Sequence, residues 1–186
     1  MRALGYKAGI GTASRVMSIE GETTTLGVLV QSNFGGRLTI KGVNVTREFN
    51  LKDTKKEGGC SSIMIIIATD FPFSNRLLNR FAKRASFGIA RAGSTGGHGS
   101  GDYVIAFSTT HRTPGAKPVS REPIAEDEGW ISVAFESAAE TTEEAIINSL
   151  FKAETVTDPN GETWEALPVD RVVSLLRSTG LIEPGF

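Results

Sequence analysis

Residues 58–70 are Gly58-Gly59-Cys60-Ser61-Ser62-Ile63-Met64-Ile65-Ile66-Ile67-Ala68-Thr69-Asp70, a small and polar lead followed by an abrupt apolar run. An apolar run of this length without alternation is typical of a strand that is covered on both faces. The lead places small nucleophilic residues, Cys60, Ser61 and Ser62, at the head of that strand. Gly and Ser are also common in an ordinary turn before a strand. We therefore predict a buried strand over Ile63–Ala68 and leave the role of the lead open at this point.

The sequence on either side of this strand predicts further strands and helices. Residues rich in β-formers occupy Thr25–Gln31 and Tyr103–Ser108, and a hairpin is expected within residues 38–45. Helical spacing predicts three helices, at Pro72–Ala85, Ser132–Thr155 and Pro168–Ser178. Ser74 is the expected N-cap of the first helix. The order of elements indicates one domain over residues 1–186 in which sheets are covered by helices.

The composition is that of an ordinary soluble globular chain. Of the 186 residues, 39% are hydrophobic and 22% are charged. The net charge of -1 supplies no attraction for nucleic acid or an anionic membrane, so neither is an expected partner. With Cys60 the only cysteine and two histidines, we predict no metal and no cofactor. No apolar run could span a bilayer and residues 1–20 lack a signal peptide's apolar core, so we expect a cytoplasmic location.

Two glycine-rich stretches suggest other kinds of site. Residues 9–14, Gly-Ile-Gly-Thr-Ala-Ser, approach the GxGxxG pattern. No predicted strand precedes them and no predicted helix follows, so a dinucleotide site is not expected. Residues 97–102 contain His98, Ser100 and Asp102 within five positions. A Ser–His–Asp relay usually draws its members from separate segments, so we interpret His98 as a loop histidine.

Several stretches match one known family in that family's order. They are residues 5–15, 27–35, 62–70, 88–94, 97–102, 142–150 and 166–171. The ordered set resembles the DmpA-like, or β-peptidyl aminopeptidase, family of N-terminal-nucleophile hydrolases (S58 peptidases), and it covers nearly the whole chain. The resemblance implies an α+β fold, an αββα sandwich of the N-terminal-nucleophile type. It also implies a precursor that cuts itself once, just before a Ser or Thr at the head of a central strand.

The resemblance places that nucleophile on Ser62. Ser61 and Cys60 are the alternatives, because the family more often has Gly or Asn before the cut and this chain has Ser61 there. A cut before Ser62 divides the chain into an α-subunit-like part, residues 1–61, and a β-subunit-like part, residues 62–186. The new terminal α-amine has an ordinary pKa near ~7.7–8.0 and can serve as the base for the hydroxyl at neutral pH. Such chemistry needs no histidine.

The resemblance places further active-site residues in two other segments. Ser100 and Asp102 match loop residues of the family, where several relatives carry Glu in place of Asp102. In this interpretation Asp102 orients Ser100 or holds the charge of the α-amine, while Ser100 relays a proton to or from Ser62. Asn33 matches the family's Asn in an Asn-Phe-Gly turn and is a candidate amide donor to a tetrahedral oxyanion. Asn is also a common turn residue without any such role.

The implied function is a self-processing serine aminopeptidase or amidase. It would release N-terminal residues from peptides, amides or esters through an acyl-Ser62 intermediate. An acyl transferase of the ornithine-acetyltransferase kind is less favoured, because those enzymes typically use Thr as nucleophile. Family members carry a long segment before the motif of residues 9–15, so we expect a fold incomplete at its N-terminus. A homo-oligomer, or pairing with a missing N-terminal segment, is therefore expected, and a catalytically inactive fragment or non-enzymatic partner is the third alternative.

Overall fold

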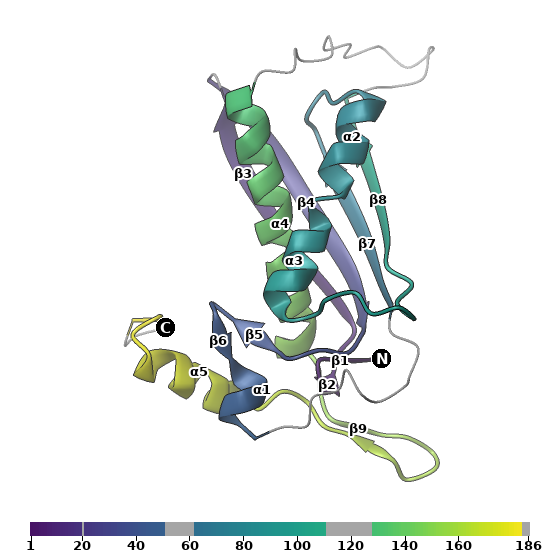
Figure 1. Ribbon diagram of the computed structural model, residues 1–186, viewed down its shortest axis with the longest axis vertical. Helices are drawn as coiled ribbons and strands as arrows, with labels where there is room; N and C mark the ends of the chain where they lie inside the picture. The colour runs from purple at the N-terminus through teal and green to yellow at the C-terminus, as the bar shows by residue number, and fades with distance from the viewer. Residues whose placement is uncertain (20, 51–61, 111–127, 184–186) are drawn as a thin grey trace.

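A four-stranded sheet forms the centre of the computed structural model, which describes residues 1–19, 21–50, 62–110 and 128–183 (Figure 1). The strand order is β3-β4-β7-β8. The four strands are β3 Ile10–Ile19, β4 Glu22–Asn33, β7 Ser62–Thr69 and β8 Tyr103–Ser108. Strand β4 is antiparallel to both of its neighbours, whereas β7 and β8 are parallel. The apolar run around Ile65 is thus an inner strand of the sheet, as predicted.

Three helices lie over one face of this sheet (Figure 1). They are α2 Asn75–Ala82, α3 Ala85–Ala92 and α4 Glu128–Phe151. The shorter elements are β1 Arg2–Ala3, β2 Tyr6–Lys7, β5 Thr39–Ile40, β6 Val43–Asn44, α1 Val45–Glu48, β9 Val156–Thr157, β10 Thr163–Trp164 and α5 Val169–Ser178.

The predicted helices and hairpin are confirmed with shifted boundaries. Ser74 is the N-cap of α2, and its Oγ accepts a hydrogen bond from Leu77 N at 3.3 Å. Between β5 and β6, Lys41 and Gly42 both have positive φ, at 49° and 82°, as a tight hairpin turn requires. Helix α4 is one helix that begins earlier and ends earlier than predicted. Helix α3 was not predicted.

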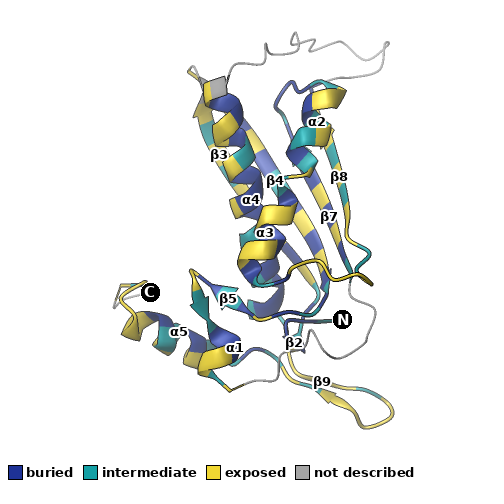
Figure 2. Ribbon diagram, in the orientation of Figure 1, coloured by how far each residue is buried: buried dark blue, intermediate teal, exposed yellow. Residues whose placement is uncertain are grey.

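Burial alternates along β7 (Figure 2), so the two faces of the sheet differ sharply in exposure there. On the helix side, Ile63, Ile65 and Ile67 are at most 1% exposed. On the outer face, Met64 and Ile66 are 41% and 40% exposed. The expectation that this strand is covered on both faces is therefore wrong for the described residues, because the covering helices all lie on one side.

The outer apolar face extends from β7 onto both neighbouring strands. Ile66 lies between Leu29 of β4 and Ile105 of β8 in the register, and all three side chains are exposed. Tyr103 and Phe107, two residues to either side of Ile105, are exposed as well. We call Leu29, Met64, Ile66, Tyr103, Ile105 and Phe107 the outer apolar face.

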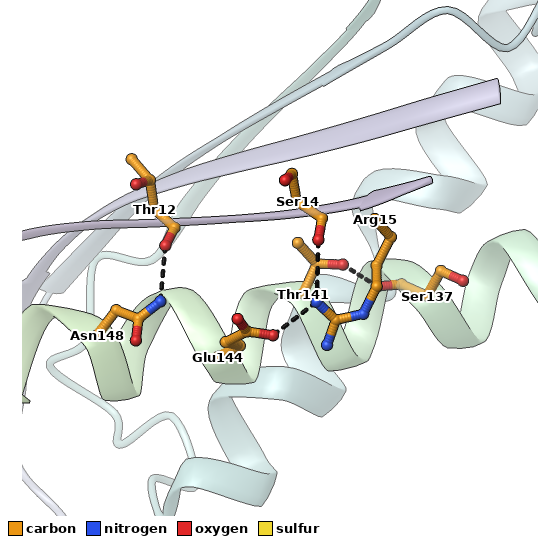
Figure 3. A network of polar contacts seen from close by, with 7 residues as sticks. All are labelled: Thr12, Ser14, Arg15, Ser137, Thr141, Glu144 and Asn148. Carbon is orange, nitrogen blue, oxygen red and sulfur yellow. Dashed lines mark hydrogen bonds and ion pairs between the residues drawn. The ribbon is translucent and has the colours of Figure 1, made fainter. Parts of the chain in front are cut away.

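Helix α4 sits close against β3 at the glycine-rich motif (Figure 3). A methyl group added to Gly11 would collide with the carbonyl oxygen of Ala145, so glycine is needed for the helix to approach. Polar contacts fix the position. Asn148 Nδ2 donates to Thr12 O at 2.9 Å, and Arg15 pairs with Glu144 at 2.6 Å. The motif of residues 9–14 is thus a packing feature of a strand.

Candidate active site

The topology of the sheet brings three segments to one edge. Because β7 and β8 are parallel, both begin at the same edge, and the antiparallel strand β4 ends there. Strand β4 ends at Asn33 and β7 begins at Ser62, and these two residues are direct partners in the register. The loop that ends at Asp102 leads into β8 at the same edge. This edge therefore gathers all four residues that the sequence put forward, although they lie far apart in the chain.

Ser62 and Asn33 present their side chains to the same face. Along β7, Ser62 has the parity of the exposed Met64 and Ile66, and along β4, Asn33 has the parity of the exposed Leu29. Residues that face one another in an antiparallel pair have Cβ atoms about 4.5–5.5 Å apart. Both side chains are half-buried, at one end of the face that none of the described helices covers.

The Ser62 hydroxyl lies directly against the loop before β8. A methyl group added to Gly101 would lie 3.1 Å from Ser62 Oγ and 3.5 Å from Cε2 of Tyr103. Only a glycine leaves the hydroxyl full room here, and the Tyr103 ring lies within contact distance of the same spot. Sequence reasoning passed over both residues. The one available signal was that Gly101 stands between two candidate site residues in a loop that ends at a predicted strand.

Ser100 and Asp102 are joined by a short hydrogen bond. Ser100 Oγ donates to Asp102 Oδ1 at 2.7 Å, and a turn closed by Ser100 N and Gly97 O at 2.9 Å shapes the loop. A bond from a hydroxyl to a carboxylate is stronger than one between neutral groups, and it fixes the direction of the proton. The oxygen lone pairs of Ser100 are thus turned away from Asp102. His98 lies exposed on the same loop, and the serine and carboxylate contact each other without it.

The carboxamide of Asn33 has a defined orientation. Its Oδ1 accepts a hydrogen bond from the main-chain N–H of Arg2 at 3.2 Å. A main-chain N–H can only donate, so the atom facing Arg2 is the oxygen and the Nδ2 end is turned to the other side. The contribution of Arg2 was not foreseen, because a main-chain contact between residues 31 positions apart leaves no pattern in the sequence.

The described residues form no metal centre. Among them, no three His, Cys, Asp or Glu side chains gather closely enough to hold an ion. In the same part of the chain no helix is both long and apolar enough to cross a bilayer. Cys60 and Ser61, the alternative nucleophiles, lie outside the described residues.

Comparison with known proteins places the chain in a family. The model of peptidase family S58 matches residues 1–164. The chain belongs to this family. Its membership confirms the resemblance seen in the sequence.

Two relatives show how much of the S58 architecture the chain spans. The β-peptidyl aminopeptidase BapA of Sphingosinicella microcystinivorans is 38% identical over an aligned length of 196 residues. The alignment covers 95% of this chain and 49% of that protein. A solved structure of a Pyrococcus horikoshii OT3 protein is 43% identical with a TM-score of 0.83, covering 98% of this chain and 50% of that one. The chain therefore spans about half the length of these relatives.

A third comparison confirms the fold class. The L-aminopeptidase D-Ala-esterase/amidase of Ochrobactrum anthropi, described as a prototype serine aminopeptidase with a variant of the N-terminal-nucleophile hydrolase fold, is 34% identical with a TM-score of 0.84. The match covers 98% of this chain and 51% of that one. The expected α+β fold of the N-terminal-nucleophile type is thus confirmed. The described residues supply one helical layer and one sheet of it.

Proposed function

We propose that this chain is the nucleophile-bearing part of a self-processing serine aminopeptidase, with Ser62 as nucleophile. One observation carries the proposal: Asn33, Ser62 and the hydrogen-bonded pair of Ser100 and Asp102 meet at one edge of the sheet. A nucleophile, an amide donor and an oriented carboxylate are the parts that acyl transfer needs. Membership of peptidase family S58 supports the same chemistry.

Self-processing would use the Ser62 hydroxyl on the chain itself. Oγ attacks the carbonyl carbon of Ser61, and collapse of the tetrahedral intermediate breaks the peptide C–N bond. The hydroxyl proton passes to the Ser62 nitrogen, which becomes a free amine, and the acyl group then sits on Oγ as an ester. Water hydrolyses the ester and leaves residues 1–61 and 62–186 as two chains. The half-buried position of Ser62 at the start of β7 supports this, because the strand holds the hydroxyl in place.

Substrate turnover would repeat this chemistry with an external carbonyl. The α-amine of Ser62 takes the proton from Oγ, which attacks the substrate and forms an acyl-Ser62 intermediate. The departing amine receives that proton, and water later releases the acyl group. Asn33 Nδ2 would donate to the oxyanion, a contribution worth about 10²–10³ in rate for one such donor. Ser100, with its proton held by Asp102, would accept a hydrogen bond from the α-ammonium group.

The outer apolar face supports a partner for this chain. Six exposed apolar side chains continue directly from Ser62 over the uncovered side of the sheet. Contiguous apolar surface of this kind marks an interaction site in soluble proteins. Since the relatives are about twice as long, we propose that a second layer covers this face. It would come from a segment that corresponds to the part of the relatives that this chain does not span, which we expect to be N-terminal, or from another copy in a homo-oligomer. That layer would complete the pocket for a peptide, amide or ester.

The same exposure favours one competing function. A chain whose nucleophile opens onto an uncovered apolar face would lack part of a substrate pocket, and it would act as a non-enzymatic or inactive partner with the same fold. Acyl transfer of the ornithine-acetyltransferase kind stays less favoured, because the residue at the head of β7 is Ser62 rather than Thr.

Mass spectrometry of the purified chain tests the proposal. We expect two fragments that meet between Ser61 and Ser62, and a single intact chain for Ser62→Ala, since no hydroxyl then remains to attack. Ser61→Ala is the matched control, because it removes the neighbouring hydroxyl and should still be cut. A cut in Ser62→Ala, or a new terminus at Ser61 or Cys60, would contradict the assignment. An intact wild-type chain would favour the inactive partner.

A further inference from the structure

The Asn33 carboxamide is held by a main-chain group rather than by a side chain. Arg2 N donates to Asn33 Oδ1 at 3.2 Å across 31 positions of sequence. An unrestrained carboxamide turns readily about its last torsion, which has a broad and roughly two-fold profile. Without a partner for Oδ1, the amide would present oxygen to Ser62 in part of the population. An oxygen there repels an oxyanion, whereas Nδ2 stabilises it.

The segment that carries Arg2 is unusually well fixed. A two-residue turn joins β1 to β2, with Leu4 at φ 53° and Gly5 at φ 95°. A positive φ is unfavourable for Leu, and it persists where the surroundings over-determine it. Here the Leu4 side chain is 1% exposed, and its main-chain N–H donates to Phe34 O at 2.8 Å, directly beside Asn33.

We propose that Arg2 is a positioning residue, whose main-chain N–H selects the orientation of Asn33 in which Nδ2 faces the reacting carbonyl at Ser62. The proposal rests on the function proposed above. The buried turn at Leu4 holds the donor in place, so residues 1–5 act as a brace for the amide donor. The identity of the Arg2 side chain is immaterial to this role. Its N–H is essential.

Amide hydrogen exchange tests the hydrogen bond independently of activity. We expect the Arg2 amide to exchange about five- to tenfold faster in Asn33→Ala than in the wild type, the change expected for one ordinary hydrogen bond. Asn33→Asp keeps the acceptor and should keep the protection. The Leu4 amide, bonded to Phe34 O, is the internal control and should not change in either variant. Equal exchange of the Arg2 amide in the wild type and Asn33→Ala would overturn the proposal.

The effect on chemistry is read from the rate at which a serine-directed fluorophosphonate labels Ser62, followed by mass spectrometry. Arg2→Pro removes the N–H at the first residue of a strand, where proline is tolerated, and Arg2→Ala retains it. We expect labelling about five- to tenfold slower in Arg2→Pro than in Arg2→Ala, which also loses the side-chain contact with the Trp164 ring and is therefore the matched reference. In an Asn33→Ala background, Arg2→Pro should have no further effect, since the brace then has nothing to hold.

The outcomes separate the two proposals. If the wild type is not labelled at Ser62, or if Asn33→Ala is labelled at the wild-type rate, the proposed function or the role of Asn33 in it is wrong. If Asn33→Ala is slow and Arg2→Pro is as fast as Arg2→Ala, only the positioning role of Arg2 is overturned. An equal loss from Arg2→Pro with and without Asn33 would show a general structural effect and would also overturn it.

Discussion

Gly101→Ala is the most direct test of the site geometry. The added methyl carbon would lie 3.1 Å from Ser62 Oγ, a few tenths of an ångström closer than ordinary contact. It would also lie 3.5 Å from the Tyr103 ring, so it cannot shift freely away. The hydroxyl must therefore move, either by a small displacement or by a change of rotamer. A misplacement of about 1 Å in an active site costs about 10²-fold in rate, so we expect a loss of about 10- to 100-fold.

The same substitution should leave folding intact. Gly101 has no positive φ, so alanine fits its backbone without strain. Replacing glycine at such a position reduces the entropy of the unfolded chain and stabilises a protein by about 0.4–1 kcal/mol. The free energy of unfolding should thus stay unchanged or rise slightly while reactivity falls. If activity were lost because the protein unfolds, the free energy of unfolding would instead fall.

Two matched controls lie in the same loop. Methyl groups added to Gly97 and Gly99 meet no atom of the described residues within 4 Å, and neither residue has a positive φ. The assay compares Gly101→Ala with Gly97→Ala and Gly99→Ala for the rate of Ser62 labelling and for the thermal midpoint. The reasoning would be refuted if Gly101→Ala were labelled as fast as both controls, because the hydroxyl would then not lie against this loop.

Two further predictions concern the loop and the outer face. Asp102→Asn should keep the fold yet lose most turnover, because a neutral amide no longer fixes the Ser100 proton, whereas His98→Ala should change turnover little. Rates for an aminoacyl p-nitroanilide check this, and an essential His98 would contradict it. In the chain alone, Ile66→Ala should cost less than about 1 kcal/mol in the free energy of unfolding, and Ile65→Ala about 2–5 kcal/mol, because only Ile65 is fully buried. Denaturant unfolding measures both. A large cost for Ile66→Ala would mean that the outer face is already covered, for example in an oligomer.

Much of the fold could be predicted from local pattern. The strand Tyr103–Ser108 was predicted with its observed bounds, because a glycine-rich loop leads directly into a run of β-formers. The start of α2 followed from Ser74, whose side-chain bond to Leu77 N is a local event. Helix α3 was missed, because its Gly88 lowers helix propensity. That glycine is needed where α3 meets α4, since an added methyl group would lie 2.5 Å from Ala139 O.

For the site, too, the sequence predicts the residues and only the structure shows their contacts. Ser62, Ser100, Asp102 and Asn33 were put forward from the sequence through their ordered resemblance to a family, which residue identities alone can carry. Strand directions and register bring these four residues to one edge. Only the tertiary structure shows that Gly101 lies against the Ser62 hydroxyl and that Arg2 N donates to Asn33. Likewise, no local pattern in Ile63–Ala68 predicted that the side chains of Met64 and Ile66 would be exposed. Burial depends on which elements pack against each face, and that is a property of the assembled chain rather than of any single segment.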